Sequence, residues 1–253
     1  MQRIAFLILA LFFWALQHLS SPHAAAFAAP LTILTEEFPP YNYTEDGRVR
    51  GISTDVLRLM LAEAGMDVPA ESFQVLPWSR AYKDALSHPN TLLFSATRTK
   101  EREGLFKWIG PIAPNRNVLL ARKDRHLVIS DFLQTLRLRV GAIRDDAGEQ
   151  LLVARGYPLK LIDLTSDARS NLLKLENGRI DLFAYPETVF KWLVAQNRRN
   201  VDDYETVFVL HEGHVYFAVN KNTPDETVEK LQKALDALKE SGKVQEIIES
   251  YLR

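Results

Sequence analysis

The chain has 253 residues, a formal net charge of −1, six histidines and no cysteine. A charge this close to zero, without a basic stripe, argues against a nucleic-acid partner. No cysteine is available for disulfides or thiolate metal sites, and no His-Glu-x-x-His pattern occurs, so we expect no metal and no cofactor. Small molecules and other proteins remain as partners.

The first 28 residues have the features of a secretory signal peptide. Arg3 precedes the apolar run Ile4–Leu16, and Ala26 and Ala28 are the small residues that a signal peptidase reads. The run is shorter than the roughly 20 residues of a membrane-spanning helix, which disfavours an anchor. We predict cleavage after Ala28. Since no cysteine can carry a lipid, we expect the mature protein to be free in a periplasm. We also expect it to be a monomer.

Strands and helices alternate along the rest of the chain, and the pattern occurs twice. The first series has predicted strands at 31–35, 73–77 and 91–95, a helix capped by Ser53 or Thr54 that stops at Gly65, and a helix carrying Arg80 to Leu86. The second has predicted strands at 138–143, 159–164 and 180–184, with helices at 147–155 and 168–176. Two α/β halves with ligand at the carboxyl ends of their strands are therefore expected.

Two amphipathic helices are predicted to finish the chain. Thr223-Pro-Asp-Glu226 is a potential capping box, and apolar residues recur on one face up to Gly242. A shorter helix follows at 244–252. Because only one face of each helix is apolar, we expect both helices to cover a lobe.

Five motifs in chain order carry a resemblance to a known family. They are Phe38-Pro-Pro-Tyr41, Gly51-Ile-Ser-Thr-Asp55, Ser95-Ala-Thr-Arg-Thr-Lys-Glu-Arg102 with Phe106-Lys-Trp108, Asn177-Gly-Arg-Ile-Asp181, and the segment Leu235–Ile248. Together they span the mature chain, which resembles the family 3 solute-binding proteins of ABC importers for polar amino acids. The resemblance implies a two-lobed, type II periplasmic-binding-protein fold (α/β), and a receptor rather than an enzyme.

The resemblance also implies how the chain is divided. The first lobe would be discontinuous, comprising 29–113 plus 217–253, and the second would comprise 118–213. The hinges would lie at about 114–117 and 214–216, on two crossing strands. Such lobes rotate to close over a solute, and the closed form is presented to a permease in the inner membrane.

Small hydroxyl residues and an arginine predict a carboxylate site at the end of the third strand. Ser95, Thr97 and Thr99 offer neutral donors, and the guanidinium of Arg102 matches a planar carboxylate. The resemblance implies that Arg102, helped by Thr97, binds the α-carboxylate of the ligand. A surface ion pair between Arg102 and a neighbouring glutamate is the alternative.

Aromatic and charged residues are expected around this site. Phe38 and Trp78 stand where the family stacks aromatic rings on the solute, and Tyr41 lies in the same loop. Simple packing is the alternative for Phe38 and Tyr41. Arg80 could pair with a second acidic group of the solute, and Glu36 aligns with a position that reaches the ligand in some relatives.

The second lobe departs from the family pattern. The aspartate that binds the ligand ammonium in relatives is replaced by Pro186, between Tyr185 and Glu187. The usual glycine-threonine turn is replaced by Arg144-Asp145-Asp146-Ala147. The two aspartates could provide a cation site, Arg144 could accept an anionic group, or the acids could simply stabilise a helix N-terminus.

The resulting functional hypothesis is a periplasmic receptor that delivers a small, polar, carboxylate-bearing solute, an amino acid or a related compound, to an ABC importer. Two alternatives remain. One is a dehydratase-like enzyme on the same fold, with Glu187 as general acid near a carboxylate held by Arg102. The other is a sensory module that presents its ligand in trans to a membrane kinase or chemoreceptor.

Overall fold

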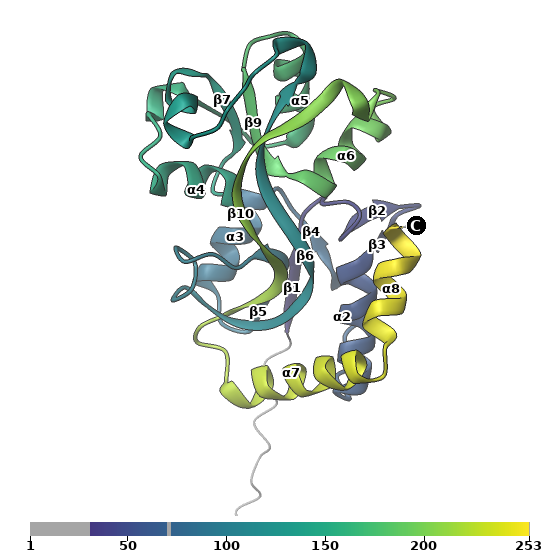
Figure 1. The fold of residues 1–253 in the computed structure, drawn as a ribbon. Coiled ribbons are helices and arrows are strands. Elements are labelled where there is room, and N and C mark those ends of the chain that lie inside the picture. Colours follow the sequence, from purple (N-terminus) through teal and green to yellow (C-terminus); the bar gives the residue numbers. More distant parts are fainter. Residues whose placement is uncertain (1–30, 70–71, 253) are drawn as a thin grey trace, which may run out of the picture. The chain divides into compact units, whose positions relative to one another are not determined.

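One eight-stranded sheet runs through the chain, with the order β4-β1-β5-β10-β6-β9-β7-β8 (Figure 1). The computed structural model describes residues 31–69 and 72–252, so the predicted signal peptide lies outside the described residues. The strands are β1 (Thr32–Thr35), β4 (Gln74–Val75), β5 (Thr91–Thr97), β6 (Phe106–Arg122), β7 (Val140–Ile143), β8 (Ile162–Thr165), β9 (Leu182–Pro186) and β10 (Tyr204–Asn220). A separate hairpin pairs β2 (Tyr43–Glu45) with β3 (Arg48–Arg50).

The long antiparallel strands β6 and β10 connect two groups of elements. One end of the pair borders β5, and through it β1 and β4; the other end borders β9, β7 and β8. The fold is therefore the expected two-lobed α/β fold. The predicted hinge segments 114–117 and 214–216 lie on these two strands, and Pro114 is paired with His214. The limits assigned to each lobe remain predictions.

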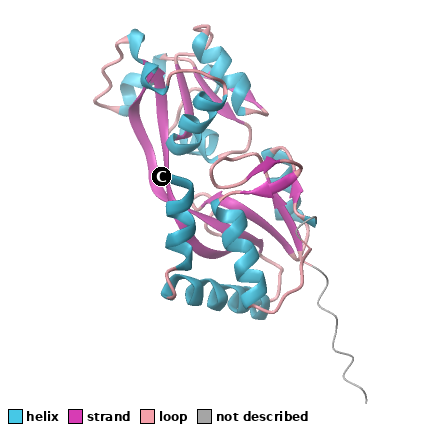
Figure 2. Cartoon of the chain, turned by 90° about the vertical axis from the view of Figure 1, so that its right-hand side faces the viewer, coloured by secondary structure: helices cyan, strands magenta, loops and turns pink. Residues whose placement is uncertain are grey.

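Each group of strands has its own helices. The helices of the first lobe are α2 (Ile52–Glu63), α3 (Trp78–Ser87), α7 (Asp225–Glu240) and α8 (Lys243–Leu252). Those of the second lobe are α4 (Ala147–Ala154), α5 (Ala168–Glu176) and α6 (Glu187–Gln196). The C-terminal helix α8 stands beside α2, as Figure 2 shows. Among residues 31–69 and 72–252, no helix is long and apolar enough to cross a membrane.

The helix α2 illustrates how sequence periodicity produces this packing. Val56, Leu57, Met60 and Leu61 are buried on one face of it. Burying a side chain of this size contributes about 1.5–3 kcal/mol. The apolar face predicted from the sequence is therefore what fixes α2 to the sheet.

Three predicted details are wrong, and each has a local reason. The helix α2 begins after Gly51, so Ser53 and Thr54 lie buried inside it and neither caps it. The predicted capping box at Thr223 does not form: Pro224 is the N-cap of α7, and the Thr223 hydroxyl instead accepts a hydrogen bond from the Asn90 backbone N–H (3.0 Å). The predicted strand at 159–164 starts only at Ile162, since a 3₁₀ turn occupies Leu159–Leu161. The sequence analysis also missed helix α6.

Candidate functional site: a cleft at the strand ends

A cleft of about 630 Å³ lies between the two lobes. Its lining includes acidic, aromatic and apolar side chains from both lobes. The lining residues are Glu36, Glu37, Pro39, Tyr43, Thr44, Val75, Leu76, Pro77, Trp78, Ile143, Ser166, Asp167, Ala168, Arg169, Tyr185, Val189, Leu193 and Gln196.

The sheet explains why these residues meet. Glu36 directly follows β1, Leu76 directly follows β4, Ser166 directly follows β8, and Tyr185 lies at the end of β9. The strands β1 and β4 are parallel, as are β7, β8 and β9. Ligands of open α/β sheets bind at such carboxyl ends. The topology therefore makes this cleft the solute site to be expected.

Two of the predicted aromatic residues line the cleft. Trp78 and Tyr185 are buried, and the Trp78 indole N–H donates to the Asp145 carbonyl in the other lobe (2.8 Å). Tyr185 stacks on Phe183, with ring centroids 4.7 Å apart. Their fixed positions suit them to contact the apolar body of a solute.

Phe38 and Tyr41 are not among the residues that line the cleft. Their rings stack on each other at 5.5 Å, and the Tyr41 hydroxyl donates to the Pro114 carbonyl (2.5 Å). The packing alternative therefore describes their contacts in this structure.

Arg102 is fully buried and already has several partners. Its exposed fraction is 1%, and its guanidinium donates to Gln150 Oε1 (2.7 Å), the Thr97 carbonyl (3.3 Å) and the Asp145 carbonyl (3.1 Å). Asp146 Oδ1 lies 3.8 Å from Arg102 Nη2. Three of these partners belong to the second lobe, so Arg102 joins the lobes directly.

Two aromatic rings enclose the same guanidinium. The Arg102 Cζ atom lies 5.1 Å from the ring centroid of Trp78 and 5.0 Å from that of Tyr82. Cation–π contacts of this length stabilise a desolvated cation. Arg102 itself is not among the residues that line the cleft.

The three predicted hydroxyl residues are buried but do not line the cleft. Thr97 Oγ1 accepts a hydrogen bond from Asn115 Nδ2 (2.9 Å). Ser95 has φ 63°, and its hydroxyl has no partner within the described part of the chain. Thr99 is likewise buried. Direct solute contact by these hydroxyls stays a prediction.

The turn before α4 places its two aspartates differently. Asp146 is the N-cap of α4, and its Oδ1 accepts a hydrogen bond from the Ala147 backbone N–H (2.6 Å). Asp145 adopts φ 61° and directs its carbonyl toward Trp78 and Arg102. The helix-stabilising alternative therefore holds for Asp146, which in addition faces Arg102.

Three other predicted site residues lie away from the cleft lining. Arg80 has a side chain that is 71% exposed and lies 3.9 Å from Asp84. Arg144 is exposed and lines a different hollow, together with Arg139 and Arg179. Glu187 forms ion pairs with Arg116 (2.8 Å) and Lys191 (3.1 Å).

Glu36 is the half-buried acid of the cleft. Within residues 31–69 and 72–252, no hydrogen bond or ion pair ends on its carboxylate. Burial raises the pKa of Glu36 well above its ordinary value, the negative charges of Asp146 and Glu37 add to this, and Arg102 opposes it. Burial likewise raises the pKa of Asp146, again opposed by Arg102. The guanidinium of Arg102 therefore opposes the rise in pKa of both carboxylates.

The raised pKa of Glu36 predicts how stability depends on pH. Above about pH 4.3 the unfolded chain releases the proton of Glu36, whereas the folded chain keeps it up to the raised pKa. The free energy of unfolding of the solute-free protein therefore decreases as pH rises through the raised pKa. Glu36→Gln should therefore raise the melting temperature at pH 7.5 and leave it unchanged at pH 4, as measured by calorimetry. Exposed Glu63→Gln on α2 is the control and should change neither. An unchanged or lower melting temperature of Glu36→Gln at pH 7.5 would contradict the prediction.

Several cleft residues were missed by the sequence analysis. They are Glu37, Tyr43, Asp167, Arg169 and Leu193. The position of Asp167, three residues after the predicted strand at 159–164, could have identified it, because ligands of open α/β sheets bind at the carboxyl ends of strands. Tyr43 and Leu193 do not follow a predicted strand. They reach the cleft because of where the β2–β3 hairpin and helix α6 lie.

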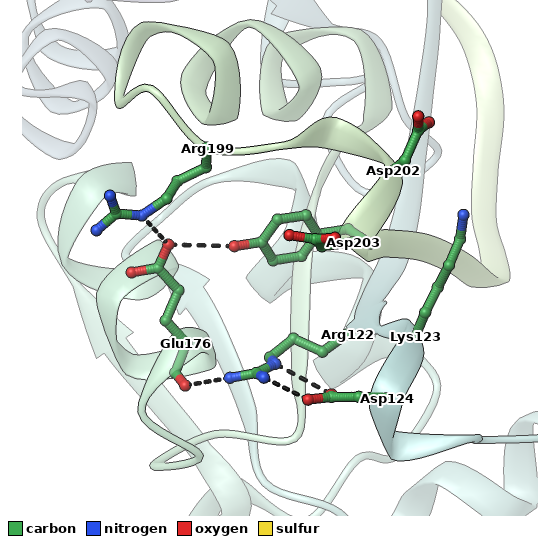
Figure 3. Close-up of a pocket in the computed structure, with 8 residues that line it drawn as sticks. Arg122, Lys123, Asp124, Glu176, Arg199, Asp202 and Asp203 are labelled. Atoms are coloured by element: carbon green, nitrogen blue, oxygen red, sulfur yellow. Dashed lines mark hydrogen bonds and ion pairs between the residues drawn. The ribbon is translucent and has the colours of Figure 1, made fainter.

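A second cavity, of about 670 Å³, lies in the second lobe and is lined by charged residues (Figure 3). Several of its charged side chains are paired: Arg199 binds Glu176 (2.7 Å), Tyr204 donates to the same carboxylate (3.2 Å), and Arg122 pairs with Asp124. None of the predicted site residues lines it. In the described part of the chain, no group of three or more His, Asp or Glu side chains could hold a metal ion.

A two-lobed sheet, two connecting strands and a cleft at the strand ends define the class of periplasmic binding proteins. Two solved structures show this fold. A histidine kinase sensor domain with similarity to periplasmic binding proteins has a TM-score of 0.77 and 20% identity, over 88% of this chain and 96% of that one. An ABC-transporter substrate-binding protein from Streptococcus pneumoniae, with bound histidine, has a TM-score of 0.74 and 18% identity, over 87% and 92%.

The sequence places the chain within this class. Residues 31–253 match the model of the bacterial extracellular solute-binding proteins, family 3, and the chain belongs to that family. A probable histidine-binding protein from Campylobacter jejuni is 22% identical over 95% of this chain and 93% of that protein. The family resemblance predicted from five motifs is therefore confirmed.

Proposed function

We propose that this protein captures a small solute in the cleft lined by Glu36, Trp78 and Tyr185, and delivers it from the periplasm to the permease of an ABC importer. The observation that carries the proposal is that both lobes contribute strand-end residues to one cleft of a volume suited to a small molecule. Solute-driven closure would then give the permease a signal that differs from the empty form. We propose a monomer, because each lobe supplies half of the site within one chain.

The sequence predicted a carboxylate on the solute, held by Arg102. Direct contact between Arg102 and such a carboxylate stays a prediction. Glu187, the acid that the enzyme alternative requires, is ion-paired with two cations outside the cleft lining. The proposal therefore assigns no reaction to this protein.

The test is mass spectrometry of small molecules released from the purified protein by denaturation. We expect one solute at close to one molecule per chain, and its loss from the Trp78→Ala variant, which removes a wall of the cleft. Uptake of that solute should fall in cells that lack the gene. A protein that retains and binds no solute, with uptake unchanged, would contradict the proposal.

One observation favours a second candidate. The likeness to a histidine kinase sensor domain suggests a protein that presents its solute to a membrane kinase. The same deletion strain separates the two functions. Unchanged uptake with a lost transcriptional response to the solute would favour sensing over delivery.

A further inference from the structure

The strand β8 is the last strand of the sheet, and in the described part of the chain it pairs with β7 alone. The Arg144 backbone N–H, just after β7, donates to the Thr165 carbonyl (3.0 Å). Thr165 therefore directs its backbone groups toward β7. Successive residues of a strand direct these groups to opposite sides, so Leu164 and Ile162 direct theirs away from β7, to the open edge.

Three backbone groups at this edge have no partner in the part of the chain that the structure describes. The Ile162 N–H is satisfied, because it donates to the Leu159 carbonyl within the 3₁₀ turn before β8. The Ile162 carbonyl, the Leu164 N–H and the Leu164 carbonyl form no hydrogen bond with backbone or side chain. A row of unpaired groups is a template for another strand. The outer edge of β8 can therefore accept a chain that brings both donors and acceptors.

A hollow of about 500 Å³ lies at the same edge, and we call it the basic hollow. Its lining residues are Arg139, Arg144, Lys160, Leu161, Ile162, Asp163, Leu164 and Arg179. The acid of this set, Asp163, is paired with Lys174 (2.7 Å). Its charge is thereby offset, and the four basic side chains give the hollow its positive charge.

Most of these cations have no partner within the chain. Arg139 donates to the Gly178 carbonyl (2.8 Å). The exposed side chains of Arg144, Lys160 and Arg179 form no ion pair or hydrogen bond with any residue that the structure describes. Basic side chains protect a sheet edge from unwanted pairing, and the same charges attract an acidic chain. The edge therefore selects its partner by charge.

The charges and the open backbone groups narrow down what can lie on this edge. A second copy of β8 would bring four more basic side chains, and like charges across paired strands are unfavourable. Residues 1–30 contain no Asp or Glu, so they offer no complementary charge. The phosphate oxygens of a lipid can accept from the Leu164 N–H, but they cannot donate to the two open carbonyls. A peptide strand supplies both.

We infer that β8 and the basic hollow bind an extended acidic segment of a protein partner, which adds to the sheet as a further strand next to β8. Backbone hydrogen bonds would align the segment, and its carboxylates would face Arg144, Lys160 and Arg179. The inference goes beyond the proposed function, and it does not depend on which solute the cleft takes.

The test is fluorescence polarisation with a labelled seven-residue peptide in which glutamate and valine alternate. At low ionic strength we expect a Kd of about 100 µM or tighter. Binding should weaken at least about fivefold in 0.5 M salt, because exposed charges are screened. A peptide with lysine in place of glutamate should not bind. The acidic peptide with proline in place of its central residue should bind at least about fivefold more weakly, because proline lacks the N–H that a ladder needs.

Two variants separate the charges from the strand edge. Arg144→Gln/Lys160→Gln should weaken peptide binding at least about tenfold, and Arg48→Gln/Lys230→Gln, which changes two exposed cations of the first lobe, is the matched control and should leave it unchanged. Leu164→Pro removes the outward N–H without removing a bond to β7, because an edge strand tolerates proline where its N–H faces outward. It should abolish binding, whereas Leu164→Ala, which keeps the N–H, should not.

A measurement on the unmodified protein covers the case in which Leu164→Pro does not fold. Bound peptide should protect the Leu164 amide from hydrogen exchange, as measured by NMR. No binding of the acidic peptide, equal binding of its proline version, or no protection of Leu164 would overturn the inference. So would binding to phosphatidylglycerol vesicles without binding of the peptide, or a dimer in analytical ultracentrifugation that Arg144→Gln/Lys160→Gln strengthens, since lipid or a second copy would then be the occupant.

Discussion

Replacing Arg102 with methionine is expected to lower the melting temperature by about 6–12 °C. The guanidinium is buried and faces Asp146, whose carboxylate would lose its countercharge. Breaking a buried ion pair by removing one partner costs about 3–5 kcal/mol. We take the lower end, because opening of the cleft would let water reach Asp146, and 1 kcal/mol shifts the melting temperature of a chain of this length by about 2–4 °C. Differential scanning calorimetry measures the change.

The second partner provides the control for this prediction. The double variant Arg102→Met/Asp146→Asn should recover most of the lost stability, because it leaves no unpaired charge behind. Arg80→Met changes an exposed arginine whose ion pair with Asp84 spans 3.9 Å, and it should shift the melting temperature little. Equal melting temperatures for Arg102→Met and Arg80→Met would show that Arg102 does not carry the contact between the lobes.

Gly51→Ala is expected to lower the melting temperature by about 8–16 °C. Gly51 has φ 121° and ψ 172°, a conformation that costs other residues about 1–3 kcal/mol. A Cβ there would lie 2.5 Å from the Tyr41 carbonyl oxygen and 2.7 Å from that of Pro40. Neither oxygen can move freely, because they accept the backbone N–H groups of Ser53 and Ile52 at the start of α2. Together we expect a cost of about 4 kcal/mol, with about 2–4 °C lost per kcal/mol.

Gly47→Ala separates the two causes in that prediction. Gly47 also has a positive φ, 72°, but a Cβ there would meet no atom within 4 Å. It should therefore show backbone strain alone, about 1 kcal/mol, and a loss of about 2–4 °C. An equal loss of melting temperature in Gly51→Ala and Gly47→Ala would show that the loop at 38–42 moves to accommodate the added methyl group.

Much of the fold could be predicted because its signals are local. The apolar face of α2 and the C-terminal helices follow from a periodic pattern within one segment, and the strand predicted at 91–95, observed as β5, follows from a short apolar run. The capping details could not be predicted, since Thr223 finds its partner at Asn90, far away in the sequence. Helix α6 was not predicted, although Val189, Phe190 and Val194 form its buried face.

The site was predicted in part, and the limit has a physical cause. Glu36, Trp78 and Tyr185 line the cleft, because the topology brings the carboxyl ends of their strands and the start of α3 together, while their contact with a solute stays a prediction. The resemblance directed attention to Arg102 but could not reveal that Asp146 pairs with it. That contact joins residues 44 positions apart across two lobes, and only three-dimensional structure brings them together.

The position of β10 in the sheet has a consequence for how the chain folds. β10 ends at Asn220, yet it lies between β5 and β6 in the sheet. The first lobe therefore cannot complete its sheet until most of the chain is available, and loop closure over such sequence distances slows folding. We expect that an emerging chain stays incompletely folded until its C-terminal third appears, a property that would suit export of the unfolded chain to the proposed periplasmic location.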